Sequence, residues 1–274
     1  MKQLSLSTSH MAKWFLPFFL MLLLPCEASA IDIKGKKDKT IIDGICYSLN
    51  AKKETAIVLK SAEPYSGDIV IPEKIEADSL TYYVEEIATS AFEKSTGMTS
   101  VVIPKTVSKI GARAFAGCSS LKAVELPKSV EELATQLFAN CSSLVDVTLP
   151  KSIRKMSTGV FKGCKSLETI SIPLSITSLP HSTFEECSNL KYVDLPTGMT
   201  SISGNAFENC SSLEEISIPT GVKNIGSEAF KGCSSLKAFT FPSSLSKVTS
   251  SVLRLTRRSA PPAAVRDPER MLAL

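Results

Sequence analysis

The chain has 274 residues, and its hydrophobic content of 43% is ordinary for a soluble protein of one or two domains. Its formal net charge of +4 resides at the two ends, because residues 1–30 contribute +1 and residues 254–274 contribute +3. The body between them is neutral, which excludes a global electrostatic argument for nucleic-acid binding.

The first 30 residues have the pattern of a secretory signal peptide. Lys13 precedes an apolar run at residues 14–24, and residues 28–30 (Ala-Ser-Ala) offer a small-residue cleavage site. We therefore predict cleavage near Ala30 and a secreted or cell-surface protein. The apolar run is too short to cross a bilayer, so we expect no transmembrane segment after signal removal. A lipoprotein attached through Cys26 is the less favoured alternative, because Pro25 stands where a small residue normally precedes the lipidated cysteine.

Residues 31–86 form the next segment. Residues 40–49 and 55–60 predict a β-hairpin cap, and residues 69–72 (Ile-Val-Ile-Pro) predict an incomplete first coil. An insertion follows, because 20 positions separate Pro72 from Phe92, whereas 11 separate Pro104 from Phe115.

From residue 87 to residue 253 the same residue types return every 23 positions. Phenylalanine shows the period most clearly, at Phe92, Phe115, Phe138, Phe161, Phe184, Phe207 and Phe230. A fixed period of this length indicates a solenoid in which each repeat is one coil. One coil cannot bury its own apolar face, so it must stack on its neighbours. We therefore expect equivalent phenylalanines to lie in adjacent turns.

A single repeat indicates how each coil is built. Val124 and Leu126 alternate with Glu125, which predicts a short strand with two side chains inward and one outward. Pro127 ends that strand, because proline lacks the amide donor. The pair Ala114-Phe115 and the residues that follow predict a helical turn or short helix on the opposite side. Strands of adjacent coils should then pair at about 4.8 Å as a parallel sheet.

The pattern Ala-Phe-x-x-Cys-x-x-Leu-x-x-Val-x-Leu-Pro resembles the BspA-like class of leucine-rich repeats over residues 87–253. The resemblance implies a right-handed α/β solenoid, with a parallel β-sheet on one face, short helical turns on the other and an N-terminal β-hairpin cap. Proteins of this class are surface or exported proteins of bacteria and some protozoa, and some adhere to host matrix or plasma proteins. The resemblance therefore implies a secreted or cell-surface binding module that adheres to a host or extracellular protein.

The cysteines occupy one repeat position at Cys118, Cys141, Cys164, Cys187, Cys210 and Cys233. A disulfide framework is one interpretation for a secreted chain. We favour buried structural thiols, because side chains in one row point the same way, which is poor geometry for a bridge. A metal site is disfavoured, because no Cys-x-x-Cys pair occurs and His181 is the sole histidine after the signal peptide. We expect no cofactor.

No catalytic motif stands out. The sequence lacks a phosphate-binding glycine loop, a nucleophile elbow and a zinc motif. His181 lies in a turn whose equivalents include Ala112, Thr135 and Gly204, which indicates a solvated loop residue. We therefore predict that the protein is not an enzyme.

The outward strand positions are the candidate partner-binding face, because the core does not dictate them. This face comprises Lys122, Glu125, Thr148, Glu168, Ser171, Lys191, Tyr192, Asp194, Glu214, Glu215, Ser217, Lys237 and Thr240. A candidate basic strip of three lysines follows the prolines at Lys105, Lys128 and Lys151. It either meets an acidic partner or only solubilises the surface.

We expect an extracellular protein or glycan as ligand, and no nucleic acid. The sequence leaves two alternatives to adhesion open. One is a non-catalytic structural spacer of the cell envelope, and the other is a polysaccharide-associated protein.

The repeat ends at Leu253, and residues 254–274 hold five of the seven arginines among prolines and alanines. This segment is either a disordered basic tail or foreign to the fold, and its abrupt start within a repeat favours the second interpretation. Either way we expect an uncapped last coil, through which the protein self-associates.

Overall fold

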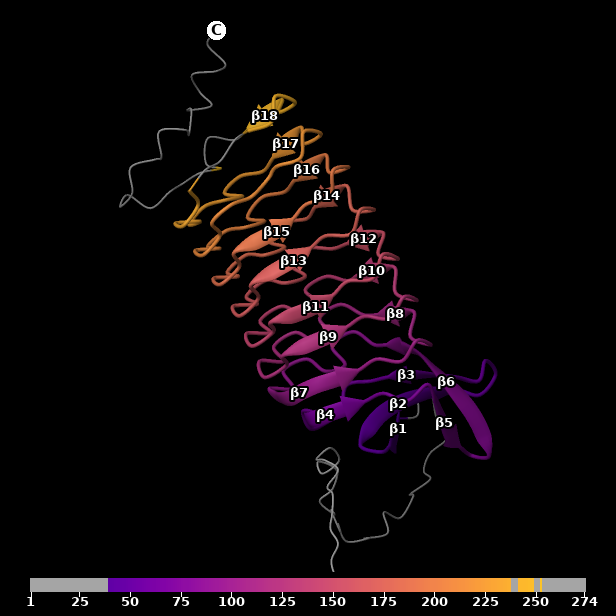
Figure 1. Ribbon diagram of the computed structural model, residues 1–274. Helices are drawn as coiled ribbons and strands as arrows, with labels where there is room; N and C mark the ends of the chain where they lie inside the picture. Colours follow the sequence, from indigo (N-terminus) through magenta and orange to yellow (C-terminus); the bar gives the residue numbers. More distant parts are fainter. Residues whose placement is uncertain (1–38, 238–240, 249–251, 253–274) are drawn as a thin grey trace, which may run out of the picture. The chain divides into compact units, whose positions relative to one another are not determined.

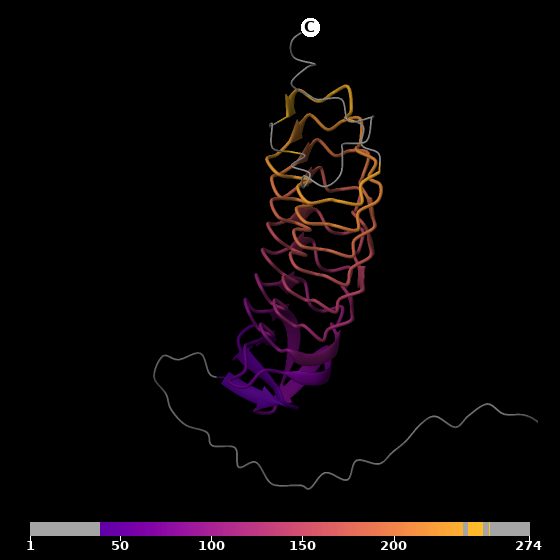
Figure 2. The ribbon, with the colours of Figure 1, turned by 90° about the vertical axis from the view of Figure 1, so that its left-hand side faces the viewer.

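The computed structural model describes residues 39–237, 241–248 and 252. The predicted signal peptide with Cys26, the tail 254–274 and Thr240 of the candidate face lie outside these residues. The described chain begins with an antiparallel group of strands and continues as a stack of similar coils (Figures 1 and 2).

Three hairpins and one crossover build the first sheet. Its order is β1-β2-β3-β6-β5, in which only the pairing of β3 with β6 is parallel. The turn between β1 and β2 has φ of +49° at Asp43 and +77° at Gly44, as a two-residue hairpin loop requires. The insertion after Pro72 is the hairpin of β5 and β6. The bounds are β1 (Lys39–Ile42), β2 (Ile45–Asn50), β3 (Thr55–Val58), β5 (Lys74–Ala77) and β6 (Leu80–Ile87).

The coils carry a first row of parallel strands, as the sequence predicts. Val124 is in register with Val147, and Ile170 with Val193, so equivalent positions of successive repeats face each other. The prolines that follow, such as Pro127, lie outside the strands. This first row comprises β4 (Ser66–Val70), β7 (Gly97–Val102), β9 (Ala123–Glu125), β11 (Asp146–Thr148), β13 (Thr169–Ser171) and β15 (Tyr192–Asp194).

A second row of parallel strands, each two residues long except β6 at its start, was not predicted. It joins the first sheet, because Ile87 of β6 pairs with Ile110 of β8. Each short strand from β8 to β17 turns one residue inward, and Leu133 of β10 faces Met156 of β12. The row continues through β8 (Lys109–Ile110), β10 (Glu132–Leu133), β12 (Lys155–Met156), β14 (Ser178–Leu179), β16 (Ser201–Ile202), β17 (Asn224–Ile225) and β18 (Lys247–Val248).

The prediction of short helical turns is wrong, because the described residues contain turns and no helix. The amide of Ala116 donates to the carbonyl of Arg113 at 3.0 Å within its turn, but the amide of Phe115 donates to Leu137 of the next coil, also at 3.0 Å. An α-helix needs every amide for its own i−4 carbonyl. Since alternate amides bond the neighbouring coil, the segment cannot wind as a helix.

Two rows of residues with a left-handed backbone conformation (positive φ) lie in the turns that make these hydrogen bonds between coils. Arg113 and Gly117 have φ of +58° and +75°, and the same two positions have positive φ in each described repeat. The first row is Ser90, Arg113, Gln136, Gly159, Ser182, Asn205 and Glu228, and the second is Lys94, Gly117, Asn140, Gly163, Glu186, Asn209 and Gly232. Only glycine adopts this conformation without steric cost.

We expect Glu186→Gly to raise the free energy of unfolding by about 0.5–1 kcal/mol. Glu186 is exposed with φ of +64°, so glycine relieves a steric cost that exceeds its own loss of chain entropy. Urea denaturation followed by circular dichroism measures the change. The matched control is Lys165→Gly, an exposed turn residue outside the positive-φ region, which should lower stability by about 0.5–1 kcal/mol. Equal effects of the two substitutions would contradict the strain argument.

A column of phenylalanine rings runs through the stack. Phe138 and Phe161 lie with ring centroids 5.8 Å apart and planes 9° from parallel, and both side chains are fully buried. The described neighbours from Phe92 to Phe230 stack in the same way, with centroid distances of 5.2–5.8 Å. This confirms the predicted alignment of the phenylalanines in adjacent turns.

The cysteines form a second buried column. The seven described cysteines are free and buried, as expected for structural thiols. The thiol of Cys164 donates to the carbonyl of Phe138 at 3.1 Å, and each other cysteine of the row bonds the phenylalanine carbonyl of the preceding coil likewise. The thiol therefore fills the core and satisfies a carbonyl at the same time.

Candidate ligand-binding face

The first row of strands exposes one set of side chains on its outer surface. Val147 of β11 and Ile170 of β13 turn inward and are buried, whereas Asp146 and Thr148 are exposed. The outer set is thereby held at strand spacing with no contribution from loops. A rigid arrangement of this kind presents side chains with little loss of conformational entropy on binding.

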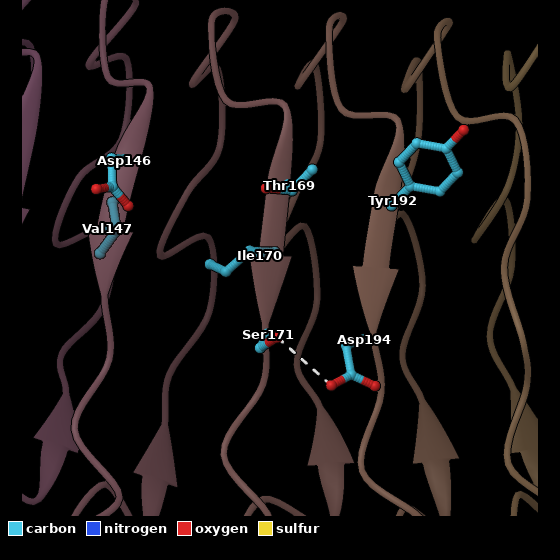
Figure 3. A pocket seen from close by; sticks show the side chains of 7 residues that line it. All are labelled: Asp146, Val147, Thr169, Ile170, Ser171, Tyr192 and Asp194. Carbon is cyan, nitrogen blue, oxygen red and sulfur yellow. Dashed lines mark hydrogen bonds between the residues drawn. The ribbon is translucent and has the colours of Figure 1, made fainter.

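A shallow depression of about 310 Å³ lies across β11, β13 and β15. Tyr192 is half-exposed at one side of it, with 50% of its surface accessible. Figure 3 shows Asp146, Thr169 and Tyr192 along one level of the strands, with Ser171 and Asp194 at the next. Its lining is Asp146, Val147, Thr169, Ile170, Ser171, Tyr192 and Asp194.

Register explains this grouping. Thr169 pairs with Tyr192, and Ser171 pairs with Asp194, whose carboxylate accepts a hydrogen bond from the Ser171 hydroxyl at 3.4 Å. The depression thus gathers an aromatic ring, hydroxyl groups and carboxylates within three strands. It contains no basic side chain.

Lysine–glutamate pairs border the strands. Lys191 Nζ lies 2.9 Å from Glu168 Oε2, and Lys237 Nζ lies 2.5 Å from Glu214 Oε2. The hydrogen bond from Lys237 holds the pKa of Glu214 below its ordinary value, and the bonds to Glu168 and Glu214 raise the pKa values of Lys191 and Lys237. These pairs are solvent-exposed, so they neutralise one another and contribute little stability.

Four carboxylates nearer the centre have no such partner. Among the ion pairs of the described chain, none includes Glu125, Asp146, Asp194 or Glu215. The face therefore combines a row of paired lysines and glutamates with four carboxylates outside the ion pairs, of which Asp146 and Asp194 line the depression with Tyr192.

The predicted residues fall on this surface to different degrees. Ser171, Tyr192 and Asp194 line the depression. The exposed Lys122, Glu125, Thr148, Glu215 and Ser217 lie elsewhere on the strand surface, and Glu168, Lys191, Glu214 and Lys237 form the paired border.

The three lysines of the basic strip differ in whether they form an ion pair. Lys105 Nζ lies 3.1 Å from Oε1 of Glu73, the residue directly before β5. Lys128 and Lys151 are exposed, and neither belongs to an ion pair within the described residues. An acidic partner would therefore meet two unneutralised lysines and one that Glu73 already contacts.

Asp146 and Thr169 line the depression but were not singled out from the sequence. Both occupy the outward position at the start of a strand, where repeat equivalents such as Ala123 carry no functional group. Asp146, Thr169 and Tyr192 follow one another at intervals of 23 residues, so they occupy the same position in adjacent coils. This periodic spacing to Tyr192 is the signal that could have identified them.

His181 is exposed in its turn, as predicted. Residues 39–237, 241–248 and 252 contain no cluster of histidine, cysteine or carboxylate side chains able to hold a metal ion. Within those residues, no helix has the length and hydropathy needed to cross a bilayer.

Comparison with known proteins places the chain. The BspA-type leucine-rich repeat region matches residues 85–214 and 159–258, in six copies. The chain is similar to a crystal structure of a leucine-rich cell-surface protein from Faecalibacterium prausnitzii A2-165, with 32% identity and a TM-score of 0.66 over 74% of this chain and 54% of that one. No curated protein matches it.

Two further solved structures are similar. A leucine-rich repeat protein from Bacteroides ovatus ATCC 8483 has 25% identity and a TM-score of 0.62, over 75% of this chain and 60% of that one. One from Eubacterium ventriosum ATCC 27560 has 25% identity and a TM-score of 0.61, over 78% and 54%. The chain thus spans little more than half the length of these relatives. The family model matches most of the repeat region, and the structure shows stacked coils with two columns of buried core residues. The chain therefore belongs to the BspA-type leucine-rich repeat family.

Proposed function

We propose that this protein is a secreted or cell-surface binding module that adheres to an extracellular protein through the first row of strands. The supporting observation is the depression around Tyr192, where an exposed aromatic ring stands among carboxylates that have no basic partner in the described chain. Tyrosine is among the residues that contribute most to protein interfaces. The six strands of the first row extend over roughly 25 Å, enough for an interface of standard size.

A glycan is the second candidate ligand, because the depression also contains Thr169 and Ser171 beside its carboxylates. Sugar hydroxyls donate to carboxylates and exchange hydrogen bonds with side-chain hydroxyls, and a sugar ring packs on an aromatic face. This composition also keeps the polysaccharide-associated alternative open, without catalysis. An envelope spacer would need no such site.

We propose a right-handed solenoid with a repeat length of 23 residues over residues 87–253, and a cap function for the strands that precede it. Pairing of β6 with β8 supports the cap, because it continues the second strand row into the first sheet. Signal cleavage near Ala30 and self-association through the last coil belong to the same proposal.

The test is binding of the purified protein to arrays of extracellular matrix proteins and of glycans, followed by titration of each ligand found. The triple variant Tyr192→Ala, Asp194→Asn, Glu215→Gln should raise Kd at least about tenfold, because removal of a central aromatic contact costs about 2 kcal/mol. These side chains are exposed, so folding should be unaffected.

The matched control places three changes on the second strand row, as Glu132→Gln, Lys155→Gln and Ser178→Ala. These residues are also exposed strand positions, and their substitution should leave Kd unchanged. Equal losses in the two variants would argue against the first row as the binding face. If neither array yields a saturable ligand, the spacer function is favoured instead.

A further inference from the structure

The first strand row ends at β4, whose outer edge has no strand partner among the described residues. Within the described chain β4 pairs with β7 alone, on one side. The amide of Ile71, directly after β4, donates to the carbonyl of Val102 at 3.1 Å. Because the direction of backbone groups alternates along a strand, Ile69 also faces β7, and the amides and carbonyls of Asp68 and Val70 point to the open edge. Figure 1 shows β4 as the terminal strand of the row beside β7.

A groove of about 410 Å³ runs along this open edge. One wall is β4 itself, with Ser66, Asp68 and Val70. The other wall is the turn between β1 and β2, at Asp43, together with the loop that carries Glu63. The groove therefore combines unpaired strand groups with space alongside them, which an added strand requires.

The second wall is held firmly by Tyr65, which is buried. Its hydroxyl donates to the carbonyl of Leu59 at 2.9 Å and accepts from the amide of Cys46 at 3.1 Å. Its own amide donates to Ser95 Oγ at 3.1 Å. These bonds tie the loop to β2 and to the first turn of the repeats, so the groove exists before any ligand binds.

The groove is acidic. Asp43, Glu63 and Asp68 line it, and no lysine, arginine or histidine does. Asp68 accepts hydrogen bonds from the hydroxyls of Thr99 at 2.7 Å and Ser100 at 2.6 Å, which lower its pKa and favour its charged form. Neither Asp43 nor Glu63 belongs to an ion pair of the described chain. The chemistry thus favours a cationic occupant.

We propose that an extended, lysine- or arginine-bearing segment of a partner protein adds to the edge of β4 as a further parallel or antiparallel strand. Backbone groups of Asp68 and Val70 supply the main-chain hydrogen bonds, and the three carboxylates select basic side chains. A second copy of this chain fits poorly, because β4 against β4 would bring two acidic grooves together without counter-charge. The site is independent of the face around Tyr192, which lies on β15.

The probe is a fluorescein-labelled nine-residue peptide of alternating lysine and threonine, titrated with the full chain by fluorescence anisotropy. Two control peptides separate the contributions. One replaces each lysine by glutamate, and the other is N-methylated at every residue, which keeps the charge and removes the backbone donors. We expect saturable binding of the lysine–threonine peptide alone, weakened by salt.

Val70→Pro is the decisive variant, because it removes an outward-pointing amide without touching the bonds of β4 to β7. It should raise Kd at least tenfold with an unchanged urea midpoint. Asp43→Asn with Glu63→Gln should raise Kd severalfold and reduce the salt dependence. The matched proline control is Leu174→Pro, at an exposed turn position where proline is favoured, since Ile176 bonds Pro173 across that turn. It should bind like the unsubstituted chain, as should Tyr192→Ala.

The proposal is overturned if the lysine–threonine peptide shows no saturable binding, or if Val70→Pro binds it with unchanged affinity. Binding of the N-methylated peptide with the same Kd as the lysine–threonine peptide would also overturn the proposal, because charge attraction alone would then explain the affinity. A concentration-dependent dimer that Val70→Pro abolishes would assign the edge to a second copy instead. Loss of ligand binding in the Tyr192 triple variant with normal peptide binding would separate the two sites.

Discussion

Replacing Phe161 with alanine is expected to lower the free energy of unfolding by about 3–5 kcal/mol. Phe161 is fully buried, with ring centroids 5.8 Å from Phe138 and 5.6 Å from Phe184, so alanine leaves a cavity between two further coils. The stacking contacts themselves contribute about 0.5–1.5 kcal/mol per pair beyond burial. Because each coil contacts only its neighbours, the loss should also weaken the coupling between the two halves of the stack.

Urea denaturation followed by circular dichroism measures this effect, and broadening or splitting of the transition would report the weakened coupling. The control is Leu174→Ala, because 80% of the Leu174 surface is exposed and its truncation should change stability by about 0.5 kcal/mol at most. A loss below about 1 kcal/mol for Phe161→Ala would contradict the phenylalanine column as the centre of the core.

Cys164 and Cys233 should react with a thiol reagent about 10³ times more slowly in the native protein than in urea. Burial raises the pKa of each from 9.0 to about 12, and each unit of pKa lowers the reactive thiolate fraction tenfold. Timed alkylation followed by peptide mass spectrometry measures each cysteine separately. Rapid modification of native Cys164, or a disulfide that resists alkylation in urea, would contradict this result.

The same shift predicts how stability depends on pH. Below about pH 9 the thiols are protonated in both the native and the unfolded chain, so they add no pH dependence. Between about pH 9 and 12 the unfolded chain loses these protons while the native chain retains them. The free energy of unfolding should therefore fall with rising pH in this window, and Cys164→Ala should reduce the slope.

The repeats were predictable because each position recurs. The phenylalanine at residues 115, 138 and 161 and the cysteine three residues later return unchanged, and both columns lie buried in the structure. A recurrent apolar position in a stack faces the same surroundings in each coil, so its burial follows from the period alone.

The turns were not predictable in the same way. Ala114-Phe115 fits a helix by composition, yet the amide of Phe115 bonds Leu137 of the next coil. Local helix propensity is weak compared with a ladder of backbone hydrogen bonds between coils. The sequence of one repeat does not show that its backbone will form such a ladder with the next repeat. The two-residue strands of the second row escaped prediction for the same reason, since Glu132–Leu133 is too short to show alternation.

The candidate binding surfaces were also only partly predictable from the sequence. Tyr192 and Asp194 were identified as outward residues from the strand pattern, but the depression that also includes Asp146 depends on lateral register between three coils. The groove beside β4 could not be foreseen, because the turn at Asp43 reaches it from a separate part of the chain and lies opposite the strand and the loop at Glu63 that precedes it.

The amino-acid sequence by itself determined the repeating coil, the buried columns and the membership of the leucine-rich repeat family, because a periodic pattern dictates which side chains must stack. The tertiary structure alone decided the conformation of the turns, the second strand row and the open edge of β4. Those features depend on backbone hydrogen bonds between segments distant in the chain, and such bonds are made by groups that every residue shares.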